Sequence, residues 1–203
     1  MIVGTLPPPR FTTRDFRVRD VDFCYGSRDG QLWPILERIF DLDLQYETTD
    51  EAVAQRKNFL VKEGIGICDM VASAKRQKVD ASDFGMMQVE LRDLISILEK
   101  HPSVATLLFT GGNSKNGPEF FFRKLARRYK LQLKILSKKS PRQFEFNLPQ
   151  TRRTIKTVSL IAPSGAANMA VGSISSYKER KAANPSYTTI DFRVEQYTPF
   201  FKE

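Results

Sequence analysis

The chain has few of the side chains that build metal clusters and disulfide frameworks. Its 203 residues include only two cysteines and one histidine. An iron–sulfur cluster needs four cysteine ligands, and a structural zinc site needs several cysteines or histidines at close spacing. The composition therefore excludes iron–sulfur proteins and argues against a zinc-dependent deaminase, and we expect neither a metal nor a cofactor. We expect Cys24 and Cys68 to be buried structural thiols, because each lies in an apolar run.

Long hydrophobic runs are also missing. No stretch of about 18 apolar residues occurs, so no transmembrane helix is predicted. The segment 1–10 lacks both a basic region and a long apolar region, which argues against a secretory signal. We therefore expect a protein without a membrane partner, located in the cytoplasm (associated with the nucleoid in a bacterium) or in a eukaryotic nucleus.

Acidic residues are scarce in one long part of the chain. The net charge is +9 and the isoelectric point is about 9.6. Between Phe120 and Tyr177 the only acid is Glu145, whereas the same window holds the basic residues Arg123, Lys124, Arg127, Arg128, Lys130, Lys134, Lys138, Lys139, Arg142, Arg152, Arg153 and Lys156. A field of one sign concentrates polyanions at a protein surface. The uneven charge therefore favours a nucleic-acid partner.

Strand-like and helix-like segments alternate along the chain. The patterns predict strands over 21–25, 64–68, 104–109 and 157–162, an edge hairpin over 131–136 and 144–146, and helices over 32–40, 51–62 (capped by Asp50), 84–100 and 118–129. Such alternation is typical of a largely parallel sheet with helices on both faces. We expect one α/β domain over residues 1–203.

Polar segments follow the predicted strands. They cover 25–33, 64–73 and 162–168, with a weaker example at 110–117. In open α/β sheets the carboxyl ends of parallel strands are where ligands bind. We therefore expect Gly26, Asp69, Gly111 and Ser164 to lie along one edge of the sheet. The segment 112–117 has the glycine spacing of a phosphate-binding loop but lacks its Lys-Ser/Thr, and no dinucleotide-binding glycine pattern is present.

The order of these segments resembles the uracil-DNA glycosylase superfamily over most of the chain. The shared features are the helix that opens with Leu32-Trp33, the Gly-x-Gly-apolar-x-Asp-x-Val-Ala-Ser segment that ends at Ser73, and the Pro-Ser-…-Ala-Asn loop that ends at Asn168. The chain looks closest to the hypoxanthine-DNA and mismatch-specific branches. This resemblance implies a three-layer α/β fold and a monofunctional, metal-independent glycosylase of base excision repair. Such an enzyme acts as a monomer on DNA that contains a damaged base.

The resemblance also implies roles for residues near the base. Asp29, the only carboxylate in its loop, would orient the hydrolytic water as the catalytic residue; a helix N-cap is the structural alternative. Asp69 would face the flipped base, with a cap of the turn at the strand end as the structural alternative. Tyr25 and Trp33 would stack on that base, with a core position as the alternative for both, and the backbone N–H groups of Gly26 and Ser27 would stabilise the leaving base. Two positions depart from the pattern: Gly30 stands where relatives carry Asn, and Leu32 replaces an aromatic residue.

The last loop resembles the one that presses on DNA in this superfamily. Pro163, Ser164, Gly165 and Asn168 would contact DNA there, and we assign Asn113 and Lys115 to DNA binding as well. Some branches carry a histidine before the Pro-Ser pair, where this chain has Ala162, and His101 precedes Pro102 in a structural setting. Two alternatives remain open: a catalytically weak or inactive DNA- or RNA-binding relative, and a basic scaffold that binds RNA or a protein.

Overall fold

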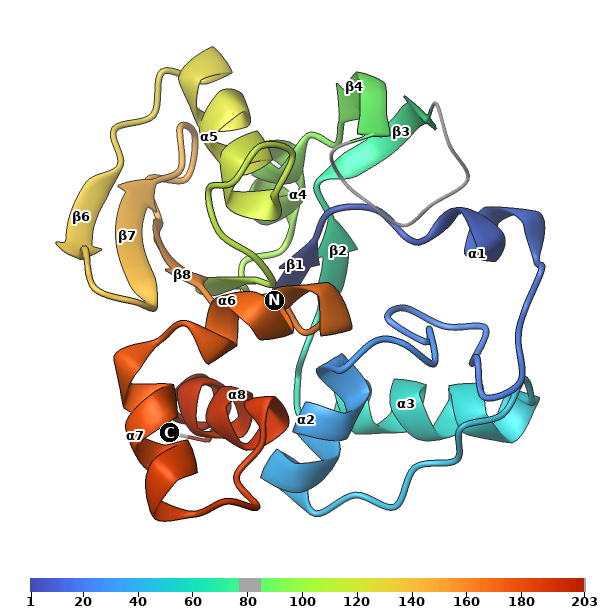
Figure 1. Cartoon of the computed structure of the whole chain (residues 1–203). Helices are drawn as coiled ribbons and strands as arrows, with labels where there is room; N and C mark the ends of the chain where they lie inside the picture. The colour runs from blue at the N-terminus through green and yellow to red at the C-terminus, as the bar shows by residue number, and fades with distance from the viewer. Residues whose placement is uncertain (77–84, 203) are drawn as a thin grey trace. The chain divides into compact units, whose positions relative to one another are not determined.

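The computed structural model describes residues 1–76 and 85–202, which form two compact units (Figure 1). Unit 1 comprises residues 1–13 and 64–160, and unit 2 comprises residues 14–63 and 161–203. The chain therefore passes between the units after Thr13, Glu63 and Leu160. Among the described residues, no helix has the length and apolar character needed to span a membrane.

Unit 1 is built around a six-stranded sheet. Its strand order is β2-β1-β5-β8-β7-β6, and the first four of these strands are parallel. A separate antiparallel hairpin joins β3 and β4. The elements are β1 (Ile2–Gly4), α1 (Pro9–Thr13), β2 (Ile67–Asp69), β3 (Val71–Arg76), β4 (Met86–Leu91), α4 (Leu94–Lys100), β5 (Thr106–Phe109), α5 (Pro118–Arg128), β6 (Lys134–Ser137), β7 (Arg142–Asn147) and β8 (Thr154–Ser159).

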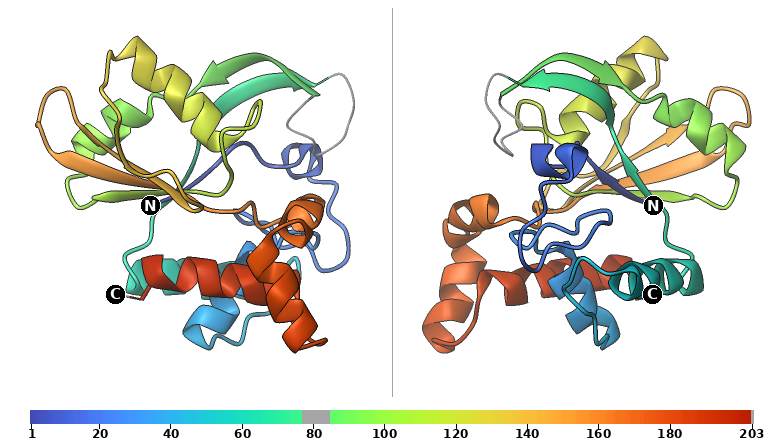
Figure 2. Two further views of the ribbon diagram at one scale, coloured as in Figure 1. Left: turned by 60° about the vertical axis from the view of Figure 1, so that its left-hand side comes forward. Right: turned by 90° about the vertical axis from the view of Figure 1, so that its right-hand side faces the viewer.

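The core of unit 1 lies on one face of this sheet. Both views in Figure 2 show α4, α5 and the β3–β4 hairpin on the same side of the strands. Side chains from α5, such as Phe122 and Leu125, pack there with Phe109 of β5 and Phe146 of β7. The structure is thus α/β with a mainly parallel sheet flanked by helices, and this part of the sequence prediction is confirmed. Helices on both faces of the sheet stay a prediction, because α4 and α5 lie on the same face in unit 1.

The first predicted strand is wrong. Residues 21–25 form a tight turn in unit 2, in which the Val21 N–H donates to the Gly26 carbonyl and the Gly26 N–H donates to the Phe23 carbonyl. The sheet instead contains an interior strand that the sequence did not predict, β1 at the N-terminus, which pairs with both β2 and β5. Val21 is buried, as expected. The backbone groups of residues 21–26 form hydrogen bonds with one another inside the turn, so they do not pair with a strand.

The predicted helix over 84–100 is half right. Phe84 lies outside the described residues, β4 occupies Met86–Leu91, and only Leu94–Lys100 forms the helix α4. The Asp93 side chain caps α4 by accepting from the Ser96 N–H. The other predicted helices and the edge hairpin are present within a few residues of their expected bounds.

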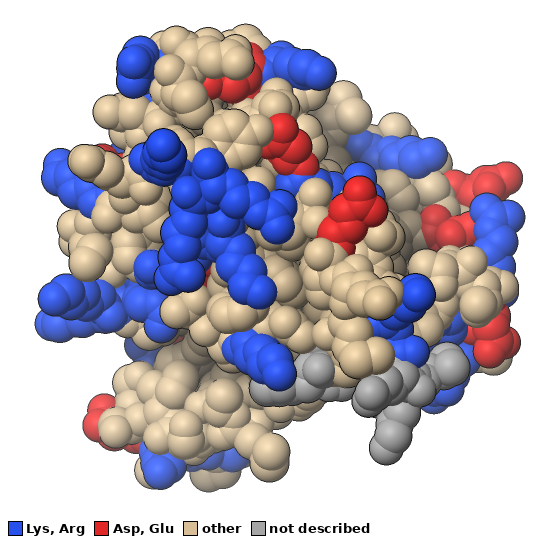
Figure 3. Space-filling model, turned by 90° about the horizontal axis from the view of Figure 1, so that it is seen from above, with Lys and Arg blue, Asp and Glu red and all other residues tan. Residues whose placement is uncertain are grey.

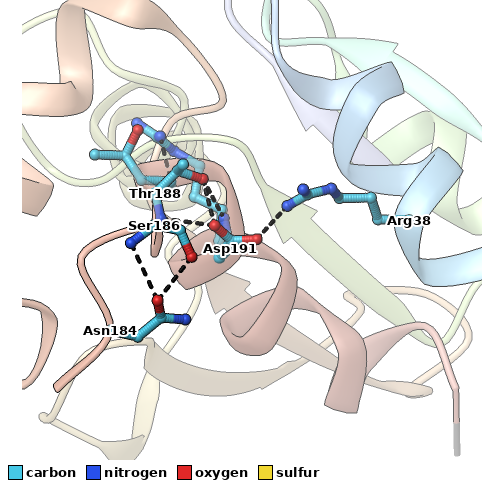
Figure 4. Close-up of polar contacts among 7 residues, drawn as sticks. Arg38, Asn184, Ser186, Thr188 and Asp191 are labelled. Carbon is cyan, nitrogen blue, oxygen red and sulfur yellow. Dashed lines mark hydrogen bonds and ion pairs between the residues drawn. The ribbon is translucent and has the colours of Figure 1, made fainter. Parts of the chain in front are cut away.

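Unit 2 is helical. It contains α2 (Leu32–Phe40), α3 (Asp50–Lys62), α6 (Asn168–Gly172), α7 (Ser175–Ala183) and α8 (Thr189–Tyr197), with 3-10 turns η2 (Gly165–Ala167) and η3 (Thr198–Phe200). Thr49, rather than Asp50, caps α3. A capping box of Thr188 and Asp191 starts α8, and Arg38 of α2 forms an ion pair with the same Asp191 (Figure 4). This arrangement fixes α8 against α2.

Candidate nucleic-acid interface

The residues assigned to the site from the sequence fall into both units. Unit 2 holds Tyr25, Gly26, Ser27, Asp29 and Trp33, together with Pro163, Ser164, Gly165 and Asn168, whereas unit 1 holds Asp69, Asn113 and Lys115. Of the four residues expected along one sheet edge, Asp69 ends β2 and Gly111 follows β5, so both lie at the carboxyl edge in unit 1. Gly26 and Ser164 belong to unit 2 and are not strand ends of this sheet.

In unit 2, two loops far apart in the sequence lie side by side. Gly30 forms an antiparallel bridge with Ser164, and the Gln31 N–H donates to the Pro163 carbonyl at 2.9 Å. The segments 25–31 and 162–168 therefore make one continuous surface element. This pairing brings together two of the three segments that carry the family resemblance.

The loop 25–31 is rigidly held. The fully buried Asp20 carboxylate accepts from the backbone N–H groups of Arg17 at 2.9 Å and Arg28 at 2.7 Å. A side chain at Gly26 would place its Cβ 1.9 Å from the Val21 carbonyl oxygen, so only glycine fits this turn. The Gly26 N–H donates to the Phe23 carbonyl. It is therefore committed to the turn, and the prediction that it stabilises a leaving base is wrong.

Asp29 projects from this loop into solvent. Its side chain is 64% exposed and lies 3.8 Å from the Arg28 Nε atom. Its backbone N–H donates to the Ser27 Oγ atom at 3.2 Å. The N-cap residue of α2 is Gln31, not Asp29, so the helix-cap interpretation does not account for this carboxylate. Tyr25, half-buried, adopts a left-handed backbone conformation with φ of 57°.

Trp33 is a core residue. It is 1% exposed, its indole N–H donates to the Cys24 carbonyl at 2.8 Å, and the buried Arg56 guanidinium lies 5.1 Å from its ring. The ring therefore supports the loop from the core of unit 2. This is the core position given above as the alternative to stacking on a base. Cys24 itself is exposed, so the expectation of a buried thiol is wrong there. Cys68 is half-buried, and neither cysteine forms a disulfide.

The loop 162–168 rests on Arg193, a residue that the sequence did not single out. The Arg193 guanidinium is fully buried and donates to the carbonyls of Ala162 at 3.0 Å and Ser164 at 3.2 Å. It also donates to the Asn168 Oδ1 atom at 2.9 Å, which accepts a second bond from Thr189 Oγ1. The Asn168 carbonyl oxygen is thus committed within unit 2. Burial lowers the pKa of Arg193 without removing its charge.

Asp69 is the one perturbed carboxylate among the predicted site residues. Burial raises the pKa of its side chain above 3.8, and the charge of Arg92 acts in the opposite direction. Its backbone pairs with Gly4 at the end of β1. A carboxyl group of this kind keeps its proton to a higher pH than an exposed aspartate, and it can then donate a hydrogen bond as well as accept one.

The loop after β5 lies at the switch point of the sheet. Strand β1 pairs with β2 on one side and β5 on the other, so the connections diverge there, and ligands bind outside such points in open α/β sheets. The Thr110 N–H donates to the Val3 carbonyl at 3.0 Å. A Cβ at Gly117 would lie 2.5 Å from the Gly112 carbonyl oxygen. This tightly folded loop carries Asn113 and Lys115, both exposed.

Several cations of the basic stretch have structural partners. Glu119, 1% exposed, accepts from Arg123 at 2.8 Å and from Arg142 at 2.5 Å. Burial alone would raise the pKa of Glu119, but these guanidinium groups lower it. Lys134 pairs with Glu145 at 2.7 Å. The other lysines and arginines leave a positive surface, which Figure 3 shows gathered over the side of unit 1 that carries α5.

Comparison with family models, with curated proteins and with solved structures gives no match to this chain.

Proposed function

We propose that this protein is a DNA glycosylase that hydrolyses the N-glycosidic bond of a deaminated base, uracil or hypoxanthine. The observation that carries this proposal is the pairing of the loops 25–31 and 162–168 through Gly30 and Ser164. The family resemblance rests on these same segments, and nothing in their local sequence requires them to meet. A three-layer fold like that of uracil-DNA glycosylases and action as a monomer belong to the same proposal.

The mechanism begins with extrusion of the damaged base, because the glycosidic bond of a stacked base is out of reach. Loop 162–168 braces the DNA through Ser164 and Gly165. Pro163 is buried, so the DNA contact predicted for it is wrong. Bond cleavage builds positive charge on the sugar, and an exposed carboxylate at Asp29 stabilises that charge and orients the attacking water. The fixed loop beneath Asp29 supports this role, since positioning requires a rigid mount.

The family resemblance assigns base recognition to Asp69, which lies in unit 1. Uracil and hypoxanthine each present an N–H group beside a carbonyl group. A carboxyl group that accepts when ionised and donates when protonated matches either edge, and burial raises the pKa of Asp69, which favours the protonated form relative to an exposed aspartate. Tyr25 would stack on the extruded base.

The test is a single-turnover assay on duplexes that each contain one damaged base, scored for abasic sites. Asp29→Ala should lower the rate for every base by about 10²–10⁴-fold, because water positioning does not depend on base identity. Asp22→Ala is the matched control: it removes another exposed carboxylate of unit 2, paired with Arg14 at 3.5 Å, and should leave the rate unchanged. Full activity of Asp29→Ala would remove Asp29 from the mechanism.

A second candidate is a DNA- or RNA-binding relative that cleaves slowly or not at all. Gly30 favours it, because a Cβ there would lie 3.0 Å from the Ser27 carbonyl oxygen and 3.3 Å from that of Tyr25. The asparagine of related proteins would thus be crowded in this slot. Leu32 is fully buried, so it offers no ring to a base. Absence of abasic sites on every duplex, with DNA binding intact, would favour this candidate.

A further inference from the structure

The turn between β6 and β7 lies at the carboxyl edge of the unit 1 sheet. Strand β8 is parallel to β5, β7 is antiparallel to β8, and β6 is antiparallel to β7. Strand β6 therefore ends at the same edge as the parallel strands. The register confirms this placement, since Arg142 at the start of β7 pairs with Ser159 at the end of β8. Residues 138–141 occupy the edge at which open α/β sheets bind ligands.

The loop 110–117 contacts Arg142, which follows this turn. A Cβ at Gly112 would lie 3.1 Å from the Arg142 Nη2 atom, so the loop 110–117 is in contact with the start of β7. Lys138 and Lys139 in the turn are exposed, as is Lys115 in the loop. None of these three lysines has a carboxylate partner within residues 1–76 and 85–202.

The charge at this end of the sheet is not balanced. Glu119 is a single carboxylate shared by Arg123 and Arg142. The Arg142 side chain remains 39% exposed while it holds Glu119. The exposed Lys115, Lys138 and Lys139 add three positive charges to the same edge of the sheet. A duplex backbone of regularly spaced phosphates is a partner that such a surface fits.

Several basic residues at the opposite end have internal explanations. Helix α5 runs from the carboxyl edge back to the start of β6, so Arg127 and Arg128 lie in its last turn, where cations stabilise the helix dipole. The Arg153 guanidinium donates to the carbonyls of Leu98, His101, Pro102 and Val104. Comparable internal partners do not account for Lys138 and Lys139.

We propose that the β6–β7 turn, with Lys138 and Lys139 beside Arg142, holds phosphates of the duplex DNA backbone. The choice of DNA as partner rests on the proposed function. Arg142 is kept out of the test, because its loss would leave the buried Glu119 with one guanidinium partner and would destabilise the fold.

The experiment measures binding of a short undamaged duplex by fluorescence anisotropy at several salt concentrations. Each phosphate contact contributes about 0.9 to the slope of log affinity against log salt. Relative to 1 M salt, this is a gain of about eightfold in affinity at 0.1 M salt. The variant Lys138→Gln/Lys139→Gln should therefore flatten the slope by about 1.8 and weaken binding by up to about 60-fold. The matched control Arg127→Gln/Arg128→Gln removes the same charge at the other end of the sheet and should change binding less than about twofold.

The outcomes separate this proposal from the proposed function. Salt-dependent binding that needs Lys138 and Lys139, without abasic sites on any damaged duplex, would support the surface and refute the glycosylase. Abasic sites together with unchanged binding of the Lys138→Gln/Lys139→Gln variant would refute the surface alone. An equal or larger loss in the Arg127→Gln/Arg128→Gln control would also refute it, as would tighter binding of single-stranded RNA than of the duplex.

Discussion

Replacement of Arg193 by methionine should destabilise unit 2 and loosen the loop 162–168. The guanidinium makes three bonds outside its own helix, to Ala162 O, Ser164 O and Asn168 Oδ1. Each acceptor keeps another partner, from the Ser164 N–H, the Ala167 N–H and the Thr189 hydroxyl respectively. We therefore take the low end for a charge-assisted hydrogen bond, about 1.5 kcal/mol each, or about 4–5 kcal/mol for the three.

Part of this loss is offset, because methionine removes the cost of burying a charge that no carboxylate of residues 1–76 and 85–202 neutralises. The expected net effect is about 2–3 kcal/mol, seen in urea unfolding as a lower midpoint with an unchanged slope. Arg193→Lys should lose a similar amount, since an ammonium group cannot reproduce the planar guanidinium fork. Arg38→Met, which removes the half-exposed partner of Asp191, should cost no more than about 1 kcal/mol.

Hydrogen exchange supplies the local readout. The amides of Ser164 and Ala167 donate within the loop, to the Ala162 and Ser164 carbonyls. In Arg193→Met these amides should exchange faster than the helical amides of α2. Wild-type exchange at both amides, together with a change in unfolding free energy below about 0.5 kcal/mol, would refute the view that Arg193 positions the loop.

Two further substitutions test the site. Gly26→Ala should lower the free energy of unfolding in urea by about 1–3 kcal/mol, because its Cβ meets the Val21 carbonyl. Gly172→Ala is the control: its Cβ enters open space, so the free energy of unfolding should not change. Equal effects of the two substitutions would contradict the packing of the turn. Asp69→Asn should shift activity among damaged bases more than it lowers DNA affinity. Burial raises the native pKa of Asp69, so stability that is fully present below pH 3.8 falls as pH rises through the raised value. Asp69→Asn should therefore gain stability over the wild type as pH rises above 3.8, and a difference that is the same at every pH would be contrary to this reasoning.

The elements that the sequence predicted well are those with one clear periodicity. Helix α2 buries Leu32, Ile35, Leu36 and Ile39 at helical spacing, and α5 begins at a proline in its first turn. Strand β7 of the edge hairpin buries Phe144 and Phe146, which are two positions apart, as its alternating sequence predicts. In each case local preference and tertiary burial agree, so the segment's own residues are sufficient to identify it.

The failures occurred where short segments depend on distant partners. Strand β1 has three residues, and only its position between β2 and β5 makes it a strand. The apolar residues of β4 fit a helical spacing as well as an extended one, and pairing with β3 decides the outcome. Helix α7 has no buried residue and α8 buries only Arg193 and Tyr197, so neither shows a periodic apolar face.

Because residues 21–25 do not form a strand, Asp29 is positioned by other contacts than those the sequence predicted. A carboxylate at a strand end would be held by the ladder behind it, but residues 21–25 have no ladder. Asp29 is held instead by Asp20 through the Arg28 N–H and by the bridge from Gly30 to Ser164. The second of these contacts depends in turn on Arg193, which holds the Ser164 carbonyl from α8. Residues near the C-terminus therefore control a loop near the N-terminus, and disturbing Arg193 should affect Asp29 without touching it.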